Sequence, residues 1–247
     1  MLQHTLTDHH INCGMGVTAE NLAQRYALTR EEQDAYAALS HQRASAARER
    51  TSDERIAVQV PTRGGSIAVT EDEHIKVETN EAVLAKLRPA FQKDGTVTAG
   101  NASGINDGAA SLVLADEARL AGRKPLARIV SWGIAGVEPD VMGIGPVPAI
   151  QMALSRAGLT IGDIDLFEIN EAFAAQYLAV EKELGLDRER TNVNGGAIAY
   201  GHPVGASGAR ILLGLAYELR RRNAKYGVAS LCIGGGQGIA VIIEHHG

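Results

Sequence analysis

Apolar and polar positions in the first part of the chain recur mainly with the spacing of helices. Residues 18–26 predict a short helix capped by Thr18. A second helix is predicted to begin at Thr29, because Thr29 is followed three residues later by Glu32 in a capping box, and to run to about Arg50. We therefore expect this part of the chain to form layered surface helices.

The next part of the chain carries two short runs of alternating apolar and polar residues. The runs at 56–60 and 66–70 predict strands, and Gly64-Gly65 between them predicts a turn. The first strand is expected to stop at Pro61, since proline has no N–H group to give to a sheet. One short helix is expected over 81–87 in the charged segment that follows.

The second half of the chain alternates between the two kinds of pattern. Strands are predicted at 126–132, 164–169, 227–233 and 238–244, and helices at 148–157, 171–184 and 208–222. The first two helices are expected to end at Gly158 and Gly185. Alternation of strands and helices at these lengths predicts an α/β layer, in which helices pack on a mixed sheet. We place a domain boundary near 120–125.

Composition narrows the class of protein. The 247 residues carry 29 acidic and 24 basic side chains, so no basic surface for nucleic acid is expected, and no apolar run approaches the roughly 20 residues of a membrane span. We expect a cytoplasmic globular protein with a folded surface of roughly 10,600 Å², which buries about 72% of the extended chain. His9, His10 and Cys13 lack a fourth ligand at a recognisable spacing, so no metal site is predicted.

Glycine is concentrated in three loops rather than spread along the chain. These loops lie at 97–104, 192–208 and 232–238. None is a P-loop, because no Gly-Lys-Ser/Thr follows at the required spacing. None is a dinucleotide-binding fingerprint, because the last loop joins two strands and opens no helix.

Three polar residues near strand ends and helix starts are the strongest candidates for chemistry. Asn170 ends a predicted strand, His202 precedes the helix at 208–222, and Cys232 ends another strand. Strand ends and helix N-termini gather on one rim of a layered α/β domain, so these side chains are expected to converge. Each also has a structural explanation, as a helix cap, as packing in a turn and as a small buried apolar residue respectively.

The loops that hold these residues resemble the C-terminal motifs of the thiolases, the acetyl-CoA acetyltransferases and 3-ketoacyl-CoA thiolases. The matching motifs are Asn170-Glu-Ala-Phe-Ala174, Gly201-His-Pro-Val-Gly-Ala-Ser-Gly208 and Cys232-Ile-Gly-Gly-Gly-Gln-Gly238, with supporting matches at 15–22, 86–91 and 98–109. The resemblance follows the family's order over nearly the whole chain.

The resemblance implies a fold and a division of the chain. It implies a thiolase-like layered α/β/α domain, with a mixed sheet flanked by helices, preceded by a helical loop or cap region. Residues 1–104 would form the cap region that contacts coenzyme A (CoA), and 105–122 the end of an N-terminal thiolase domain. Residues 123–247 would form the C-terminal thiolase domain.

The resemblance also implies an acyltransferase that joins or cleaves acyl-CoA units by Claisen condensation or thiolysis. His202 would activate a nucleophilic cysteine and, with Asn170 and a water, hold a thioester oxygen anion. Cys232 would be the acid/base, a role that suits a thiol with a pKa near neutrality. Gly234 would supply a backbone N–H donor.

The family's contacts with CoA map onto the first half of the chain. Ala99 and Ser103 fall where thiolases contact the pantetheine arm, and Leu87 and Phe91 line the same region. Lys76 would face the nucleotide end. CoA thioesters are the implied substrates, with no further cofactor and no metal, and a homo-oligomer (dimer or tetramer) is expected.

Two departures from the family pattern stand out. The family's nucleophilic cysteine lies in an Asn-x-x-Cys-x-Ser-Gly-like motif that this sequence lacks, and Cys13 falls in the loop region that follows that half. Many thiolases carry His-Met before a glycine where this chain has Gly14-Met15, which changes an acyl-pocket contact.

Several interpretations follow from these departures. In the first interpretation, the chain is the C-terminal portion of a thiolase that needs a separate N-terminal half. In the second, it is a non-catalytic CoA-binding or assembly module. In the third, it is a shortened form of an ordinary thiolase. A ketoacyl synthase is the nearest enzymatic alternative, but it decarboxylates with a pair of histidines. If a half is missing, an apolar face is exposed and the 72% burial is an upper bound.

Overall fold

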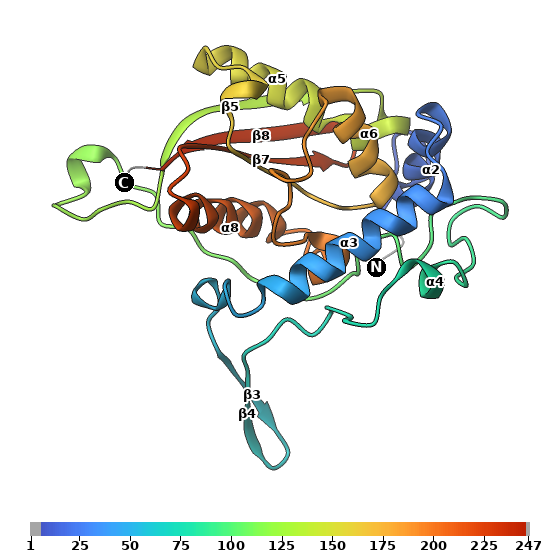
Figure 1. Ribbon diagram of the computed structural model, residues 1–247, viewed down its shortest axis with the longest axis horizontal. Coiled ribbons are helices and arrows are strands. Elements are labelled where there is room, and N and C mark those ends of the chain that lie inside the picture. The colour runs from blue at the N-terminus through green and yellow to red at the C-terminus, as the bar shows by residue number, and fades with distance from the viewer. Residues whose placement is uncertain (1–5, 246–247) are drawn as a thin grey trace.

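The centre of the molecule is a four-stranded mixed sheet. The computed structural model describes residues 6–245, and the strands follow the order β5-β8-β7-β6 (Figure 1). Their bounds are β5 Arg128–Gly136, β6 Leu166–Ile169, β7 Tyr226–Ile233 and β8 Gln237–Glu244. The two central strands pair antiparallel, and β6 alone runs parallel to its neighbour, so β6 and β7 end at the same edge.

Helices cover both faces of this sheet. On one face α5 (Pro146–Ala157) and α6 (Ala174–Leu184) share a core with Phe167 and Ile169, and on the other α8 (Ser207–Arg222) packs on Leu166. The alternation of side chains along β6 explains why consecutive residues enter different cores. The predicted α/β/α layering is confirmed.

Glycine ends two of these helices as predicted. Gly158 follows α5 and Gly185 follows α6, with φ of +66° and +61°. Glycine adopts this left-handed conformation without the steric cost of a Cβ atom.

The helices of the first half extend the layer that holds α6. These are α2 (Met15–Arg25), α3 (Arg30–Ala47) and the short α4 (Glu81–Leu84). The capping box at Thr29 is confirmed, with Thr29 and Glu32 bonded to each other's backbone N–H. The predicted cap at Thr18 is wrong: α2 begins three residues earlier, and the Thr18 hydroxyl donates to the Met15 carbonyl inside the helix.

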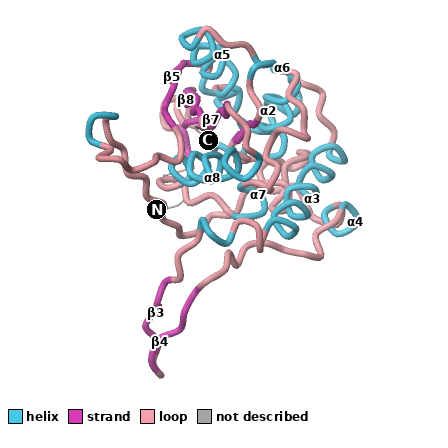
Figure 2. The backbone as a smooth tube through the Cα atoms, turned by 60° about the vertical axis from the view of Figure 1, so that its left-hand side comes forward, coloured by secondary structure: helices cyan, strands magenta, loops and turns pink. Residues whose placement is uncertain are grey.

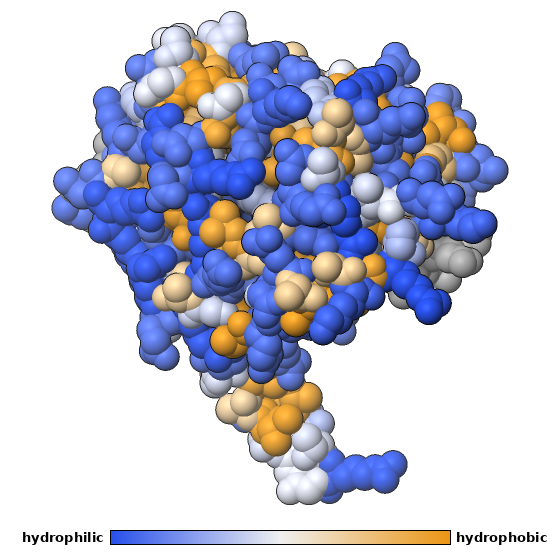
Figure 3. Space-filling view, turned by 45° about the vertical axis from the view of Figure 1, so that its right-hand side comes forward, coloured by the Kyte–Doolittle hydropathy of each residue, from blue (hydrophilic) through white to orange (hydrophobic). Residues whose placement is uncertain are grey.

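Strands β3 (Val58–Thr62) and β4 (Gly65–Val69) form a hairpin that projects from the body of the molecule (Figure 2). The strand continues through Pro61, contrary to the prediction, because a two-stranded hairpin has open edges on which a missing N–H breaks no pairing. Apolar surface gathers on the hairpin (Figure 3). Its exposed apolar side chains include Val58, Val60 and Ile67.

The remaining elements are short. They are the strands β1 (Thr7–Asp8) and β2 (Cys13–Gly14), the helix α7 (Ala197–Tyr200), and 3-10 turns at Ser52–Glu54, Glu117–Arg119, Pro139–Ile144 and Ile161–Asp163. No helix among the described residues is long and apolar enough to span a bilayer.

One face of β5 and the segment before it carry large apolar side chains into solvent. Ser131 and Gly133 face α5, so the intervening Trp132 points to the opposite face and is 56% exposed. In the extended segment at 105–116, Val113 is 94% exposed. The accessible surface is 12983 Å², against roughly 10,600 Å² for a typical monomer of this mass.

Candidate active site

Three of the predicted site residues lie at the edge where β6 and β7 end. Asn170 directly follows β6, and its backbone N–H donates to the Ser230 carbonyl of β7 over 2.9 Å. Cys232 lies two residues further along β7. His202 reaches the same edge from the loop before α8, with its Nε2 3.3 Å from Asn170 Nδ2.

The His202 ring is bonded on both sides and held by its backbone. Its Nδ1 lies 2.6 Å from the Ser207 hydroxyl oxygen, and its backbone N–H donates to the Gly104 carbonyl over 2.8 Å. Burial, with a smaller contribution from the charge of Arg210, lowers the pKa of His202 to about 4. The imidazole is therefore neutral at pH 7 and able to accept a proton.

Asn170 is not the cap of the helix that follows it. That helix, α6, begins at Ala174 with Phe173 in the N-cap position, so the cap explanation for Asn170 is wrong. The Asn170 side chain is buried, and its Oδ1 has no hydrogen-bond partner among the described residues. A buried amide oxygen without a partner is suited to binding a water or a ligand.

Cys232 is a protonated thiol in this environment. Burial raises its pKa to about 12, which differs from the near-neutral pKa expected of an acid/base cysteine. The thiol therefore holds its proton at pH 7 and is suited to donating it.

The turn after Cys232 is tied to the N-terminal hairpin of β1 and β2. The backbone N–H of Gly235 donates to the Asp8 carboxylate over 3.1 Å. Gly234 lies against Met15, because a Cβ on this glycine would be 2.5 Å from the Met15 Cε. Met15 thus contacts the loop at the point where the sequence departs from the usual His-Met.

Sequence reasoning missed Glu171, the buried carboxylate next to Asn170. It accepts hydrogen bonds from Tyr36 (2.7 Å) and Ser40 (2.6 Å) of α3, and from Asn192 (3.0 Å) and the backbone of Ile198 (3.1 Å). A charged residue directly before an apolar helix was the available signal, although its partners lie far away in the sequence. Glu171 therefore anchors the Asn170 loop to α3 and to the glycine-rich loop.

A second acidic side chain, Glu168, lies on β6 two residues before Asn170. Burial raises the pKa of Glu168 to about 8, and the charge of Arg210 on α8 partly opposes that rise. Glu168 is therefore largely protonated at pH 7, next to the strand end that carries the site.

Two of the residues predicted to contact CoA, Phe91 and Ser103, lie beside the Asn170 loop. The Phe91 ring packs edge-on against Phe173, with 5.8 Å between ring centroids. The Ser103 hydroxyl donates to the Ala172 carbonyl over 3.0 Å. Phe91 is 44% exposed, so it retains surface for a ligand.

The other predicted CoA contacts lie further from the strand ends. Leu87 packs near Gly100, next to the exposed Ala99. The Lys76 side chain is exposed, and its backbone N–H donates to His41 Nδ1 over 3.2 Å. Within residues 6–245, no contact joins the Lys76 side chain to Asn170, His202 or Cys232.

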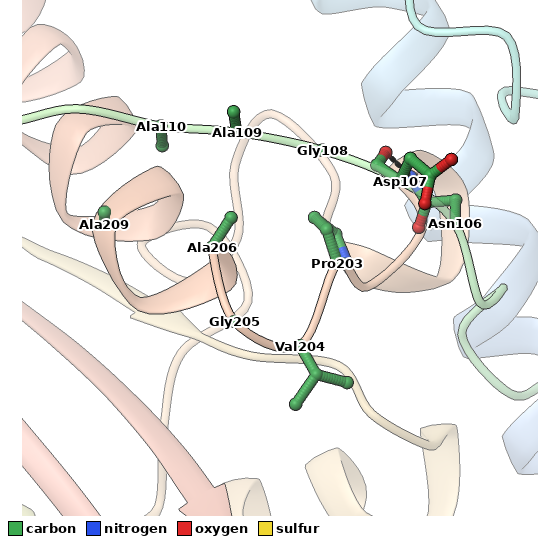
Figure 4. Close-up of a pocket in the computed structure, with 10 residues that line it drawn as sticks. All are labelled: Asn106, Asp107, Gly108, Ala109, Ala110, Pro203, Val204, Gly205, Ala206 and Ala209. Carbon is green, nitrogen blue, oxygen red and sulfur yellow. Dashed lines mark hydrogen bonds between the residues drawn. The ribbon is translucent and has the colours of Figure 1, made fainter. Parts of the chain in front are cut away.

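A shallow groove runs beside His202. Residues 106–110 form one wall, and Pro203, Val204 and Ala206 form the other (Figure 4). The groove joins the extended apolar segment to the loop that carries the imidazole.

Family models match both parts of the chain. The model described as "Thiolase, N-terminal domain" matches residues 1–118, and "Thiolase, C-terminal domain" matches 123–245. The chain belongs to the thiolase family. The resemblance seen in the three glycine-rich motifs is thereby confirmed.

Relatives of this thiolase-family chain are closely similar over its whole length. An acetyl-CoA acetyltransferase of Rhizobium meliloti (strain 1021) is 54% identical over 248 residues, which are 99% of this chain and 63% of the relative. A mitochondrial 3-ketoacyl-CoA thiolase of Homo sapiens is 54% identical over 244 residues, which are 97% of this chain and 62% of the relative.

Solved structures agree with the fold. The Bacillus anthracis acetyl-CoA acetyltransferase superposes with a TM-score of 0.97 at 50% identity, over 99% of this chain and 63% of that one. Human mitochondrial 3-ketoacyl-CoA thiolase in complex with CoA gives 0.91 at 49% identity, over 100% and 62%. The chain thus spans less than two thirds of the length of these relatives.

Proposed function

We propose that this chain provides the acid/base part of a thiolase active site that acts on CoA thioesters. The observation that carries the proposal is the meeting of an amide, a neutral imidazole and a protonated thiol where β6 and β7 end. These are the groups that a Claisen condensation or its reversal needs to hold an enolate oxygen and to move a proton at the α-carbon.

In the cleavage direction the proposed roles are as follows. His202 takes the proton of a nucleophilic cysteine, whose sulfur attacks the 3-keto carbon and breaks the bond between C2 and C3. His202, now protonated on Nε2, and Asn170 through a water hold the enolate oxygen of the departing acetyl-CoA. Cys232 gives its proton to the enolate carbon, and its thiolate then takes the thiol proton of the incoming CoA as that sulfur attacks the acyl group. The bond between the acyl group and the nucleophilic cysteine breaks, and that cysteine recovers its proton from His202.

The proposed binding of CoA uses the cap region at 1–104. Phe91 and Ser103 lie beside the Asn170 loop and would contact the pantetheine arm, together with Leu87 and Ala99. The exposed Lys76 would meet the phosphates at the nucleotide end, and Gly234 would supply a backbone donor to the thioester.

The nucleophilic cysteine of this reaction is proposed to come from polypeptide outside these 247 residues. The sequence holds two cysteines, and Cys13 lies beside Asp8 and Asp140, whose charges add to burial in raising its pKa. A thiol with a raised pKa is a poor nucleophile at neutral pH. We propose 105–122 as the end of an N-terminal domain and 123–247 as the C-terminal domain.

The apolar surface on β5 and on the extended segment supports this arrangement. Trp132 and Val113 lie in solvent in the lone chain, where apolar area carries a free-energy cost of about 25 cal/mol per Å². We propose that the polypeptide with the nucleophile covers this surface, within a cytoplasmic homo-oligomer.

The proposal is tested by thiolysis of acetoacetyl-CoA. The purified chain is assayed alone and after mixing with the N-terminal part of the Rhizobium meliloti relative that it does not match. We expect no turnover alone and measurable turnover after mixing, with a loss of about 10²–10⁴-fold in Cys232→Ser. Robust turnover by the lone chain, or equal turnover by Cys232→Ser, would contradict the proposal.

A second candidate is a non-catalytic CoA-binding or assembly module. The observation in its favour is the absence from this sequence of the cysteine motif that the chemistry requires. Calorimetric titration with CoA should then show binding that survives Cys232→Ser and weakens in Lys76→Ala, with no activity after mixing with an N-terminal thiolase part.

A further inference from the structure

The two ring nitrogens of His202 have different kinds of neighbour. Nε2 faces the Asn170 side-chain nitrogen at 3.3 Å, and Nδ1 faces the Ser207 hydroxyl at 2.6 Å. A neutral imidazole carries one hydrogen, on one nitrogen or the other, and only the nitrogen without hydrogen can accept a proton. The neighbours therefore determine which end of the ring is the base.

The hydrogen bonds around the ring are mutually consistent for one position of the hydrogen. In the orientation that the Asn170 amide has in this structure, its Nδ2 group faces the ring and only donates, so Nε2 is the acceptor in that contact. The Ser207 hydroxyl donates its own hydrogen to the Pro203 carbonyl over 3.1 Å. Its lone pairs are then free to accept from Nδ1–H, which places the hydrogen on Nδ1.

The position of Ser207 is set by the start of α8. It is the first residue of that helix, it is fully buried, and its backbone N–H also donates to the Pro203 carbonyl over 2.9 Å. The hydroxyl oxygen is thus held at the His202 ring by the main chain. Arg210, one turn further along α8, is the charged group that acts on His202, and its charge adds to burial in keeping the ring neutral.

We propose that Ser207 is a positioning residue that keeps the hydrogen of His202 on Nδ1 and thereby leaves Nε2 as the base. The inference rests on the proposed function, in which Nε2 receives the proton of the nucleophile. The bond from Nδ1–H to Ser207 is the same before and after Nε2 is protonated. The ring therefore keeps one orientation while Nε2 first accepts the proton and then donates it in a hydrogen bond to the enolate oxygen.

The test is the state of the two nitrogens in the unmodified chain, read by ¹⁵N–¹H correlation NMR of ¹⁵N-histidine-labelled protein at pH 7. His202 is assigned by the signals that disappear in His202→Gln. We expect Nδ1 to carry the hydrogen and Nε2 to carry none. A hydrogen on Nε2 in the unmodified chain would overturn the proposal without any variant of Ser207.

Variants of Ser207 distinguish the effect of its hydroxyl from the effect of its packing. Ser207→Ala should shift the population toward hydrogen on Nε2, and Ser207→Thr, which keeps the hydroxyl, should restore Nδ1. Ser131→Ala is the matched control, because it also removes a buried hydroxyl bonded to a backbone carbonyl, at 2.6 Å, but far from the ring. An unchanged His202 spectrum in folded Ser207→Ala would contradict the proposal.

Activity gives an independent readout. In the mixed thiolysis assay Ser207→Ala should lower kcat about 10- to 100-fold with little change in KM, since CoA binding does not involve this hydroxyl. If mixing gives no turnover in any variant, the proposed function fails, and the NMR result still decides the role of Ser207.

Discussion

The loop that carries Asn170 and the segment that leads into β5 differ in how well their side chains are buried and bonded within this chain. Around Glu171, hydrogen bonds from α3 and from the glycine-rich loop surround a buried carboxylate. Along 105–116, and on one face of β5, large apolar side chains lie in water. The first region is held by contacts within this chain, whereas the second is the surface that we propose meets further polypeptide.

The largest effect is expected from Glu171→Ala. The change leaves the Tyr36 and Ser40 hydroxyls and the Ile198 backbone N–H as buried donors without the carboxylate that accepts from them, so the free energy of unfolding should fall by about 3–5 kcal/mol. Urea denaturation followed by circular dichroism measures it. Glu189→Ala, whose side chain is 87% exposed, is the control and should change stability by less than about 0.5 kcal/mol. Equal effects would contradict the anchoring role of Glu171.

The next effect depends on pH and concerns Glu168. The pKa of Glu168 is about 8 in the folded protein against an ordinary 4.5, so the folded protein keeps a proton that the unfolded chain loses between these values. Stability therefore falls as pH rises from about 4.5 to 8.

Glu168→Gln removes that titration. One pKa unit corresponds to about 1.4 kcal/mol, and we expect a gain of about 1–3 kcal/mol at pH 9 and almost none at pH 4. Urea denaturation at the two pH values is the measurement, with Glu189→Gln as the control. A gain of the same size at both pH values would show that Glu168 is not a buried acid.

A smaller effect is expected at the start of α3, the helix that brings Tyr36 and Ser40 to Glu171. Thr29→Ala removes one half of the capping box and should cost about 1 kcal/mol. Thermal denaturation measures the loss, with Ser111→Ala at an exposed position as the control. No loss would mean that packing alone fixes this helix.

The smallest effect on stability is expected in the exposed region. Val113→Ser should change the free energy of unfolding by less than about 0.5 kcal/mol, because the side chain is 94% exposed. The same change should weaken the apparent affinity for the N-terminal thiolase part in the mixed assay several-fold. A loss of about 2 kcal/mol in the lone chain would show that the segment already packs against the domain.

The sequence predicted the elements of the sheet layer well, because their patterns are local. Glycines at 158 and 185 ended their helices where expected, and β6 to β8 fell within two residues of the predicted bounds. The start of α6 was predicted three residues too early, because Asn170 has the chemistry of a cap while its position is set by β7 and His202.

The candidate site was only partly predictable, because some of its contacts join residues that are far apart in the sequence. Motifs pointed to Asn170, His202 and Cys232, whose approach follows from two strands ending at one edge. Glu171 was missed because its partners Tyr36 and Ser40 lie more than 130 residues away, and no local pattern encodes that contact. The raised pKa of Cys232 likewise comes from burial, which the sequence around it does not show.

We propose that this chain holds the groups that move a proton at the α-carbon of a CoA thioester. The deciding measurement is incubation of the chain with acetyl-CoA in D₂O, followed by mass spectrometry of deuterium in the acetyl methyl group, since this exchange does not require the nucleophilic cysteine. We predict exchange above the buffer rate that is lost in Cys232→Ala and reduced in His202→Gln. Exchange at the buffer rate in the unmodified chain, or at an unchanged rate in Cys232→Ala, would contradict the claim.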